Sequence, residues 1–156
     1  MTKTNAMRLI EQAHIDFQCT QYDYDENDLA GTTAAAAIGM PAEQVFKTLV
    51  ARGAKNGIAV FCIPVCCSLD LKKAAKALCD KSVEMVAVKD LLSLTGYVRG
   101  GCSPIGLKRN YPLFIDEAAQ LYDKIAVSAG VRGQQIILNP NDLINYLSMN
   151  IFDLTE

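Results

Sequence analysis

Two apolar runs joined by a short link constrain the fold of this chain more than any other feature. Residues 45–52 and 58–64 are apolar and rich in β-branched side chains, and the link between them begins and ends with glycine. Such runs predict two strands, and so short a link predicts that the strands form a hairpin. Helical patterns lie on both sides of this hairpin at irregular intervals. The sequence therefore predicts a mixed α+β fold and not a doubly wound parallel sheet.

The other elements follow from apolar spacing and from residues that begin or end helices. Helices are expected at 4–13, 32–39, 69–78, 88–94 and 139–147, and further strands at 15–24, 113–116, 125–128 and 135–138. The expected caps are Thr4, Thr32 or Thr33, and Ser68 at helix starts, and Gly39 and Gly96 at helix ends. Composition alone leaves open whether the sheet closes into a barrel.

The bulk properties predict one compact domain that spans residues 1–156. A chain of this length buries roughly 70% of its unfolded surface on folding. Its residues are 51% hydrophobic and 21% charged, which is typical of a globular protein. No apolar run approaches the roughly 18 residues that cross a bilayer, and the N-terminus lacks a signal-peptide pattern. We therefore expect a cytoplasmic protein without a membrane partner, whose six cysteines are reduced thiols.

A glycine-rich loop is the strongest candidate for a functional feature. Residues 100–106 read Gly-Gly-Cys-Ser-Pro-Ile-Gly, so the loop is stiff and its backbone can approach a ligand closely. Such a loop can direct N–H groups at a carbonyl or a developing oxyanion, although the same pattern also occurs in ordinary tight turns. Lys47 lies among apolar neighbours, so its ammonium is expected in a pocket or along a strand face. We expect the loop and this amine to face each other across a small cavity.

Other chemically active side chains give weaker indications. His14 is the only histidine and falls at the end of a predicted helix, which favours a structural role. A Ser-His-Asp triad, a Cys-His pair and most zinc hydrolase sites would all depend on this one residue. Cys62, Cys66 and Cys67 lack the paired spacing of a metal site, and buried cysteine behaves as a small hydrophobe. We expect neither a metal nor a cofactor.

Two further features each have two interpretations. Cys102 occupies the glycine loop, where nearby amides could lower the pKa of its thiol, or it fills a tight bend as a small side chain. Lys72, Lys73 and Lys76 share one helix flank, which is either a solvated face or a contact to a nucleic acid.

The chain resembles the YbaK-type deacylases, which are free-standing relatives of the editing domain inserted in bacterial prolyl-tRNA synthetases. The motifs that carry the resemblance run in the family's order, from about Phe17 to Leu143. They are residues 44–50, 69–78, 83–85, 95–97, 100–106 and 128–133. The Ser-Pro-Ile-Gly ending of the loop and the Leu-Lys-Arg that follows resemble the cysteinyl-tRNA branch more than the alanyl-tRNA branch.

This resemblance implies a single domain with a strongly curved, barrel-like mixed sheet flanked by helices. It also implies a trans-editing enzyme that removes cysteine from mischarged Cys-tRNA(Pro), and from Cys-tRNA(Cys) as a further substrate. In that branch the substrate's own thiol attacks its carbonyl and leaves as a cyclic thioester, so the activity is classed as lyase or hydrolase. The alternatives are an Ala-tRNA(Pro) deacylase that uses water, and a non-catalytic module that binds an aminoacyl end or a synthetase.

The resemblance also implies partners. They are the 3′ end of an aminoacyl-tRNA and, transiently, prolyl-tRNA synthetase. The net charge of −2 agrees with contact to little beyond the 3′ end, because autonomous nucleic-acid binders usually carry a basic surface. A partner would then supply affinity for the rest of the tRNA.

The predicted site combines the residues with the family pattern. The catalytic set is Lys47 with the backbone amides of Gly100, Gly101 and Cys102, which would stabilise the oxyanion. Relatives carry an apolar residue at the position of Cys102, and some carry an acidic residue where this chain has Gln135. The substrate-binding set is Tyr22, Phe46, Thr48, Ser103, Pro104, Gly106, Ser128 and Gly130.

Overall fold

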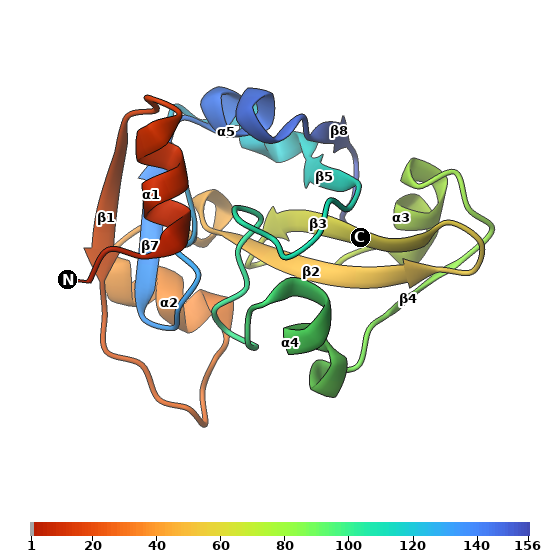
Figure 1. Cartoon of the computed structure of the whole chain (residues 1–156), viewed down its shortest axis with the longest axis horizontal. Helices are drawn as coiled ribbons and strands as arrows, with labels where there is room; N and C mark the ends of the chain where they lie inside the picture. Colours follow the sequence, from red (N-terminus) through yellow and green to blue (C-terminus); the bar gives the residue numbers. More distant parts are fainter. Residues whose placement is uncertain (1) are drawn as a thin grey trace.

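The computed structural model describes residues 2–156 and contains two sheets with helices packed around them (Figure 1). The α-helices are α1 (Asn5–Gln12), α2 (Gly31–Ile38), α3 (Leu71–Ala77), α4 (Val88–Thr95) and α5 (Pro140–Leu147), and two 3-10 turns are η1 (Ala42–Gln44) and η2 (Glu117–Leu121). The strands are β1 (Phe17–Gln21), β2 (Phe46–Gly53), β3 (Gly57–Pro64), β4 (Val83–Met85), β5 (Leu113–Asp116), β6 (Ile125–Ser128), β7 (Gln134–Leu138) and β8 (Asn150–Phe152). The predicted α+β class is confirmed.

The hairpin predicted from the two apolar runs forms the centre of the larger sheet. Strands β2 and β3 are antiparallel along their whole length, and Gly53 pairs with Gly57 at the turn. The order of this sheet is β4-β2-β3-β5-β8, with β5 parallel to both β3 and β8. Strand β4 pairs with only the last part of β2, from Ala51 to Gly53. The first half of β2 therefore has one edge that β4 does not cover.

The smaller sheet has the order β1-β7-β6 and meets the larger one at a seam. One parallel bridge, between Val45 and Ala126, joins the two sheets. At this bridge η1 ends and β2 begins, and the N–H of Val45 donates to Ala42 O. The expected barrel-like sheet is thus two sheets that do not close into a barrel within residues 2–156. The uncovered edge of β2 lies beside this seam.

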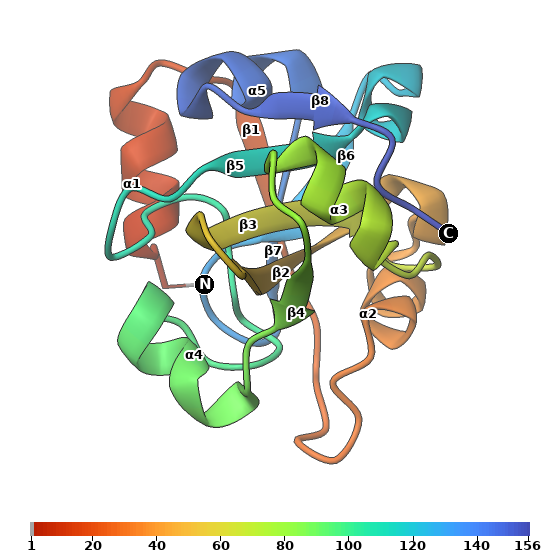
Figure 2. The ribbon, with the colours of Figure 1, turned by 90° about the vertical axis from the view of Figure 1, so that its right-hand side faces the viewer.

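Helices cover the outer faces of both sheets and complete the core (Figure 2). Helix α1 buries Ala6, Met7 and Ile10, which recur three and four residues apart and so share one face. Ile10 packs in one cluster with residues of β6, β7 and α5, whereas α3 packs over Phe61 of β3 in a second cluster. Burying a side chain such as Ile10 stabilises the fold by about 1.5–3 kcal/mol.

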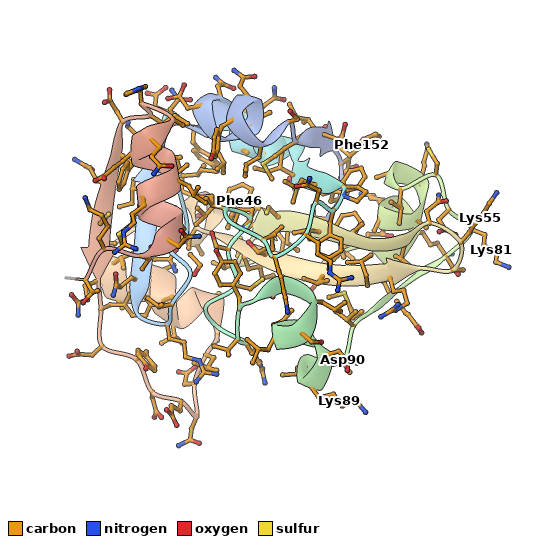
Figure 3. All side chains as sticks on the ribbon, in the orientation of Figure 1. Phe46, Lys55, Lys81, Lys89, Asp90 and Phe152 are labelled. Carbon is orange, nitrogen blue, oxygen red and sulfur yellow. The ribbon has the colours of Figure 1, made fainter. Side chains whose placement is uncertain are left out.

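Most charged side chains lie at the periphery of the molecule, but Asp116 is 3% exposed. Figure 3 shows Lys55 and Lys81 projecting at the tip of the hairpin, whereas Phe46 lies inside and is only 2% exposed. Within residues 2–156, no helix combines the length and the apolar character that crossing a bilayer requires.

Candidate active site

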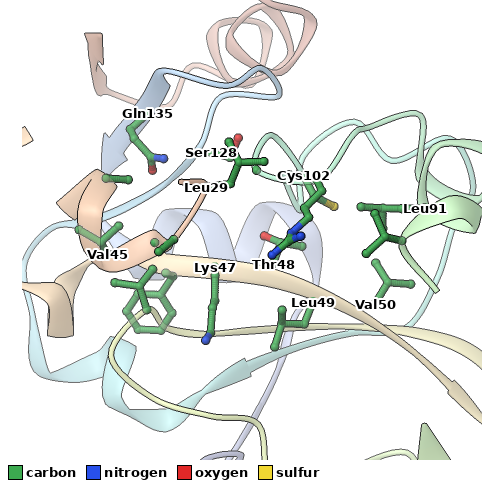
Figure 4. Close-up of a pocket in the computed structure, with 18 of the residues that line it drawn as sticks. Leu29, Val45, Lys47, Thr48, Leu49, Val50, Leu91, Cys102, Ser128 and Gln135 are labelled. Atoms are coloured by element: carbon green, nitrogen blue, oxygen red, sulfur yellow. The ribbon is translucent and has the colours of Figure 1, made fainter. Parts of the chain in front are cut away.

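A cavity of about 360 Å³ lies at the seam between the two sheets (Figure 4). Its walls come from the uncovered edge of β2, the start of α2, helix α4, the loop before Cys102, and the ends of β6 and β7. The structure brings seven of the predicted site residues to this cavity, and they are Tyr22, Phe46, Lys47, Thr48, Gly100, Cys102 and Ser128.

Five predicted residues lie outside the cavity lining: Gly101, Ser103, Pro104, Gly106 and Gly130. Ser103 and Pro104 are buried, and the hydroxyl of Ser103 accepts a hydrogen bond from the N–H of Ile105 at 3.2 Å. Their role as contact residues stays a prediction; in this structure Ser103 and Pro104 lie behind the cavity wall, inside the loop.

Side chains alternate between the two faces of β2, and this places Lys47 on the opposite face from the side chain of Cys102. Thr48 Oγ1 lies 3.6 Å from Cys62 Sγ, and Val50 packs against Cys102, so these two side chains share one face of β2. Successive side chains of a strand point to opposite faces. Lys47 therefore leaves β2 on the other face, as Figure 4 shows. The amine and the loop border one cavity, but they do not face each other directly as expected.

The glycine loop offers fewer free donors than predicted. The N–H of Gly101 already donates to Val98 O at 3.0 Å. The N–H groups of Gly100 and Cys102 have no hydrogen-bond partner within residues 2–156. Both residues line the cavity. Of the three amides predicted as donors, two are thus without a partner within residues 2–156.

Ser128 fixes this loop against the turn that follows β6. Its hydroxyl donates to Gly101 O at 3.0 Å and accepts from the N–H of Gly130 at 3.1 Å. A Cβ on Gly101 would lie 3.1–3.2 Å from backbone atoms of Val131 and Arg132, so the two segments touch through their main chains. The sequence identified Ser128 as a contact to substrate; in this structure its hydroxyl proton is committed to Gly101 O and one of its two acceptor lone pairs to the N–H of Gly130.

Tyr97 fills the space behind the loop. Its hydroxyl donates to Ile105 O, and a Cβ on Gly130 would lie 2.9 Å from its ring. Burial raises the pKa of Tyr97 to about 12. The phenol therefore stays protonated and keeps donating throughout the neutral range.

The thiol of Cys102 is not activated. The side chain is 8% exposed and packs against Val50 and Val60, and this burial raises the pKa of the thiol to about 11. The thiolate, not the thiol, is the nucleophile, so the group is inert near neutral pH. The interpretation of Cys102 as a small side chain in a bend agrees with this geometry.

The charged residues in the cavity lining are cationic, although the whole chain is slightly acidic. Lys47 and Arg99 line it, and none of the described residues in the lining is Asp or Glu. Lys47 is half-buried and forms no ion pair within residues 2–156. Arg99 was not predicted, although its position directly before Gly100 is a signal that could have indicated it.

Several other lining residues escaped sequence reasoning. Gln135 is 6% exposed, and the sequence marked it only as a departure from some relatives. The apolar part of the wall comes from Leu29, Val45 and Leu91. The sequence around an apolar side chain does not show whether it lines a cavity, because apolar residues of the core recur along the chain in the same pattern. His14 is exposed at the end of α1 with φ of 59° and lies outside this lining.

Comparison with known proteins decides the family. The family model described as "Aminoacyl-tRNA editing domain" matches residues 29–146. This chain belongs to that family. The resemblance to YbaK-type deacylases is therefore confirmed.

One curated relative and two solved structures are similar along nearly the whole chain. An Enterococcus faecalis (strain ATCC 700802 / V583) protein named "Putative Cys-tRNA(Pro)/Cys-tRNA(Cys) deacylase EbsC" is 44% identical over 153 residues, which is 98% of this chain and 93% of that protein. A crystal structure titled as a "putative trans-editing enzyme for prolyl tRNA synthetase" has a TM-score of 0.83 at 23% identity, over 100% of this chain and 99% of the other. A hypothetical protein of known structure has a TM-score of 0.86 at 20% identity, over 96% and 97% of the two chains. The two structures share the fold.

The close approach at Gly101 generates a testable prediction. Gly101→Ala places a Cβ against main-chain atoms that cannot rotate away, so we expect unfolding to become about 1–3 kcal/mol easier. Denaturation in urea measures this change. Leu121→Ala is the control, because that side chain is 77% exposed and its loss removes little packing. Unchanged stability of Gly101→Ala would show that the two segments do not depend on this contact.

Proposed function

We propose that this protein is a trans-editing enzyme that removes cysteine from Cys-tRNA(Pro), with Cys-tRNA(Cys) as a further substrate. One observation carries the proposal: the cavity offers two free amide donors and two cations but no activated nucleophile. Membership of the editing family and the name of the 44% identical relative support the substrate class.

The missing nucleophile is supplied by the substrate. The thiol sulfur of the bound cysteinyl group attacks its own carbonyl carbon, forming a C–S bond and a cyclic thioester. The ester C–O bond breaks, and the leaving ribose oxygen takes up a proton in place of the one that the thiol loses. Because the sulfur is already tethered to the carbonyl, the reaction gains from proximity rather than from a protein side chain.

The chain's own residues contribute by binding and by stabilising charge. Negative charge develops on the carbonyl oxygen as the sulfur attacks, and the amides of Gly100 and Cys102 are the donors free to receive it. Ser128 holds these donors in place through Gly101. The neutral thiol of Cys102 adds a small apolar surface beside the substrate.

The cations serve the nucleotide part of the substrate. Lys47 lies on the opposite face of β2 from Cys102, which suits the ribose or phosphate of the terminal nucleotide better than the reacting carbonyl. Arg99 is exposed at the rim of the cavity. With a net charge of −2, the protein is not built to hold a whole tRNA electrostatically, and prolyl-tRNA synthetase is the proposed transient partner that supplies the remaining affinity.

A panel of aminoacyl-tRNAs tests this function. We expect release of cysteine from Cys-tRNA(Pro), with seryl and alanyl esters more than about 1,000-fold slower because they lack the attacking sulfur. Selection by pocket size alone gives only about 10- to 200-fold. Radiolabelled release assays measure the rates, with and without prolyl-tRNA synthetase. If alanine is released faster than cysteine, the protein is instead an Ala-tRNA(Pro) deacylase that uses water. If no ester is cleaved, the non-catalytic binding module is the remaining interpretation.

Substitution of Cys102 separates substrate-thiol chemistry from an enzyme-thiol mechanism. Cys102→Ala keeps the backbone amide, so we expect most of kcat/KM for Cys-tRNA(Pro) to remain. A protein nucleophile would instead make the loss at least about 1,000-fold. Steady-state kinetics give the answer, with the exposed Cys79→Ala as the control.

Substitution of Lys47 tests its assignment to the nucleotide. Lys47→Ala is expected to raise KM for the tRNA several-fold with little change in kcat, and to reduce the salt dependence of binding by about one phosphate contact. Kinetics at several salt concentrations measure both effects, and Lys55→Ala at the hairpin tip is the matched control. A fall in kcat at unchanged KM would place the amine at the reacting carbonyl.

A further inference from the structure

The side chain of Gln135 is buried in the cavity without a partner. The residue is 6% exposed and lines the same cavity as Ser128 and Cys102. Its Oε1 atom is buried and accepts no hydrogen bond within residues 2–156. Leaving a buried amide unpaired costs free energy, so such a group in a native cavity indicates that something else completes it.

The register of the small sheet places Gln135 next to the glycine loop. Gln135 pairs with Ser128 of β6, and directly paired residues project from the same face of a sheet. Ser128 in turn is bonded to Gly101 O. Figure 4 shows the amide of Gln135 and the side chain of Ser128 on the same side of β2. If the carbonyl oxygen of a ligand accepts hydrogen bonds from the loop amides, the atoms bonded next to its carbonyl carbon therefore lie near Gln135.

The chemistry of the cavity selects the ligand group. An aminoacyl ester carries an α-amino group two bonds from its carbonyl carbon, and this group needs a hydrogen-bond acceptor. Lys47 and Arg99 can only donate, and none of the described lining residues is a carboxylate. The hydroxyls of Ser128 and Thr48 are already engaged or lie against Cys62. Gln135 is the buried side chain whose acceptor is free.

We propose that Gln135 binds the α-amino group of the aminoacyl substrate through its amide oxygen, an inference that rests on the proposed function. Rotation about the terminal side-chain torsion, which is broad and roughly two-fold, can turn the oxygen toward the ligand. Gln135 is then a binding residue that sets the direction in which the aminoacyl group lies. It distinguishes an aminoacyl ester from an acyl ester that lacks the amino group.

The test compares two non-cleavable ligands. One is adenosine with cysteine joined to the 3′ position through an amide, and the other is the same compound made with 3-mercaptopropanoic acid, which lacks the α-amino group. We expect the wild-type protein to bind the cysteinyl compound about tenfold more tightly by calorimetric titration. Gln135→Leu should bind both compounds equally, whereas Gln135→Glu, which keeps an acceptor, should restore the preference.

The outcomes separate this inference from the proposed function. A tenfold preference that persists in a folded Gln135→Leu variant, or no preference in the wild type, overturns the role of Gln135 while cysteine release from tRNA stands. If neither compound binds the wild type and no ester is cleaved, the proposed function and this inference fall together. Circular dichroism and thermal unfolding check that the variants fold, and Gln135→Met provides a second apolar replacement if Gln135→Leu does not.

Discussion

The main-chain contact between the glycine loop and the turn after β6 is the constraint on which the cavity depends. Gly101 lies against the backbone of Val131 and Arg132, and the Ser128 hydroxyl joins Gly101 to Gly130. This contact holds the loop at one side of the cavity through the carbonyl of Gly101, whereas the N–H of Gly101 donates to Val98 O. The N–H groups of its neighbours Gly100 and Cys102 have no partner within residues 2–156. The N–H groups of the loop that are free to bind a ligand therefore belong to Gly100 and Cys102, the two neighbours of the tightly packed Gly101.

Local sequence signals predicted most of the elements, and the errors have identifiable structural causes. Thr4 caps α1 and Gly39 and Gly96 end their helices in the left-handed conformation, as predicted. Ser68 was wrong as a cap because Asp70, two residues later, accepts from the N–H groups of Lys72 and Lys73. The start of α2 was also wrong, because Ala30 precedes it and no side chain caps it. Strand β8 was missed because its three residues are exposed and gain their pairing from β5, far away in the chain.

The site was only partly predictable because its residues meet through the seam between the sheets. The sequence shows that a loop is rich in glycine, but which glycine packs and which faces the cavity depends on the turn after β6. It shows that Lys47 lies in a strand, but the face on which its amine emerges depends on what packs against Thr48 and Val50. Arg99 and Gln135 reach the cavity from separate segments; Arg99 had the adjacent Gly100 as a signal, whereas Gln135 had no neighbour in the sequence that marked it as a cavity residue.

The hairpin turn has a consequence for the chemistry of the cavity. Lys47 and Thr48 are adjacent, and the pairing that begins where Gly53 meets Gly57 decides which of them emerges on each face of β2. A slip of one residue in that pairing would exchange the ammonium and the hydroxyl between the two faces. The hairpin turn does not line the cavity, but its length determines which face of β2 carries Lys47. A change in that length would therefore alter the cavity as much as a substitution of a lining residue.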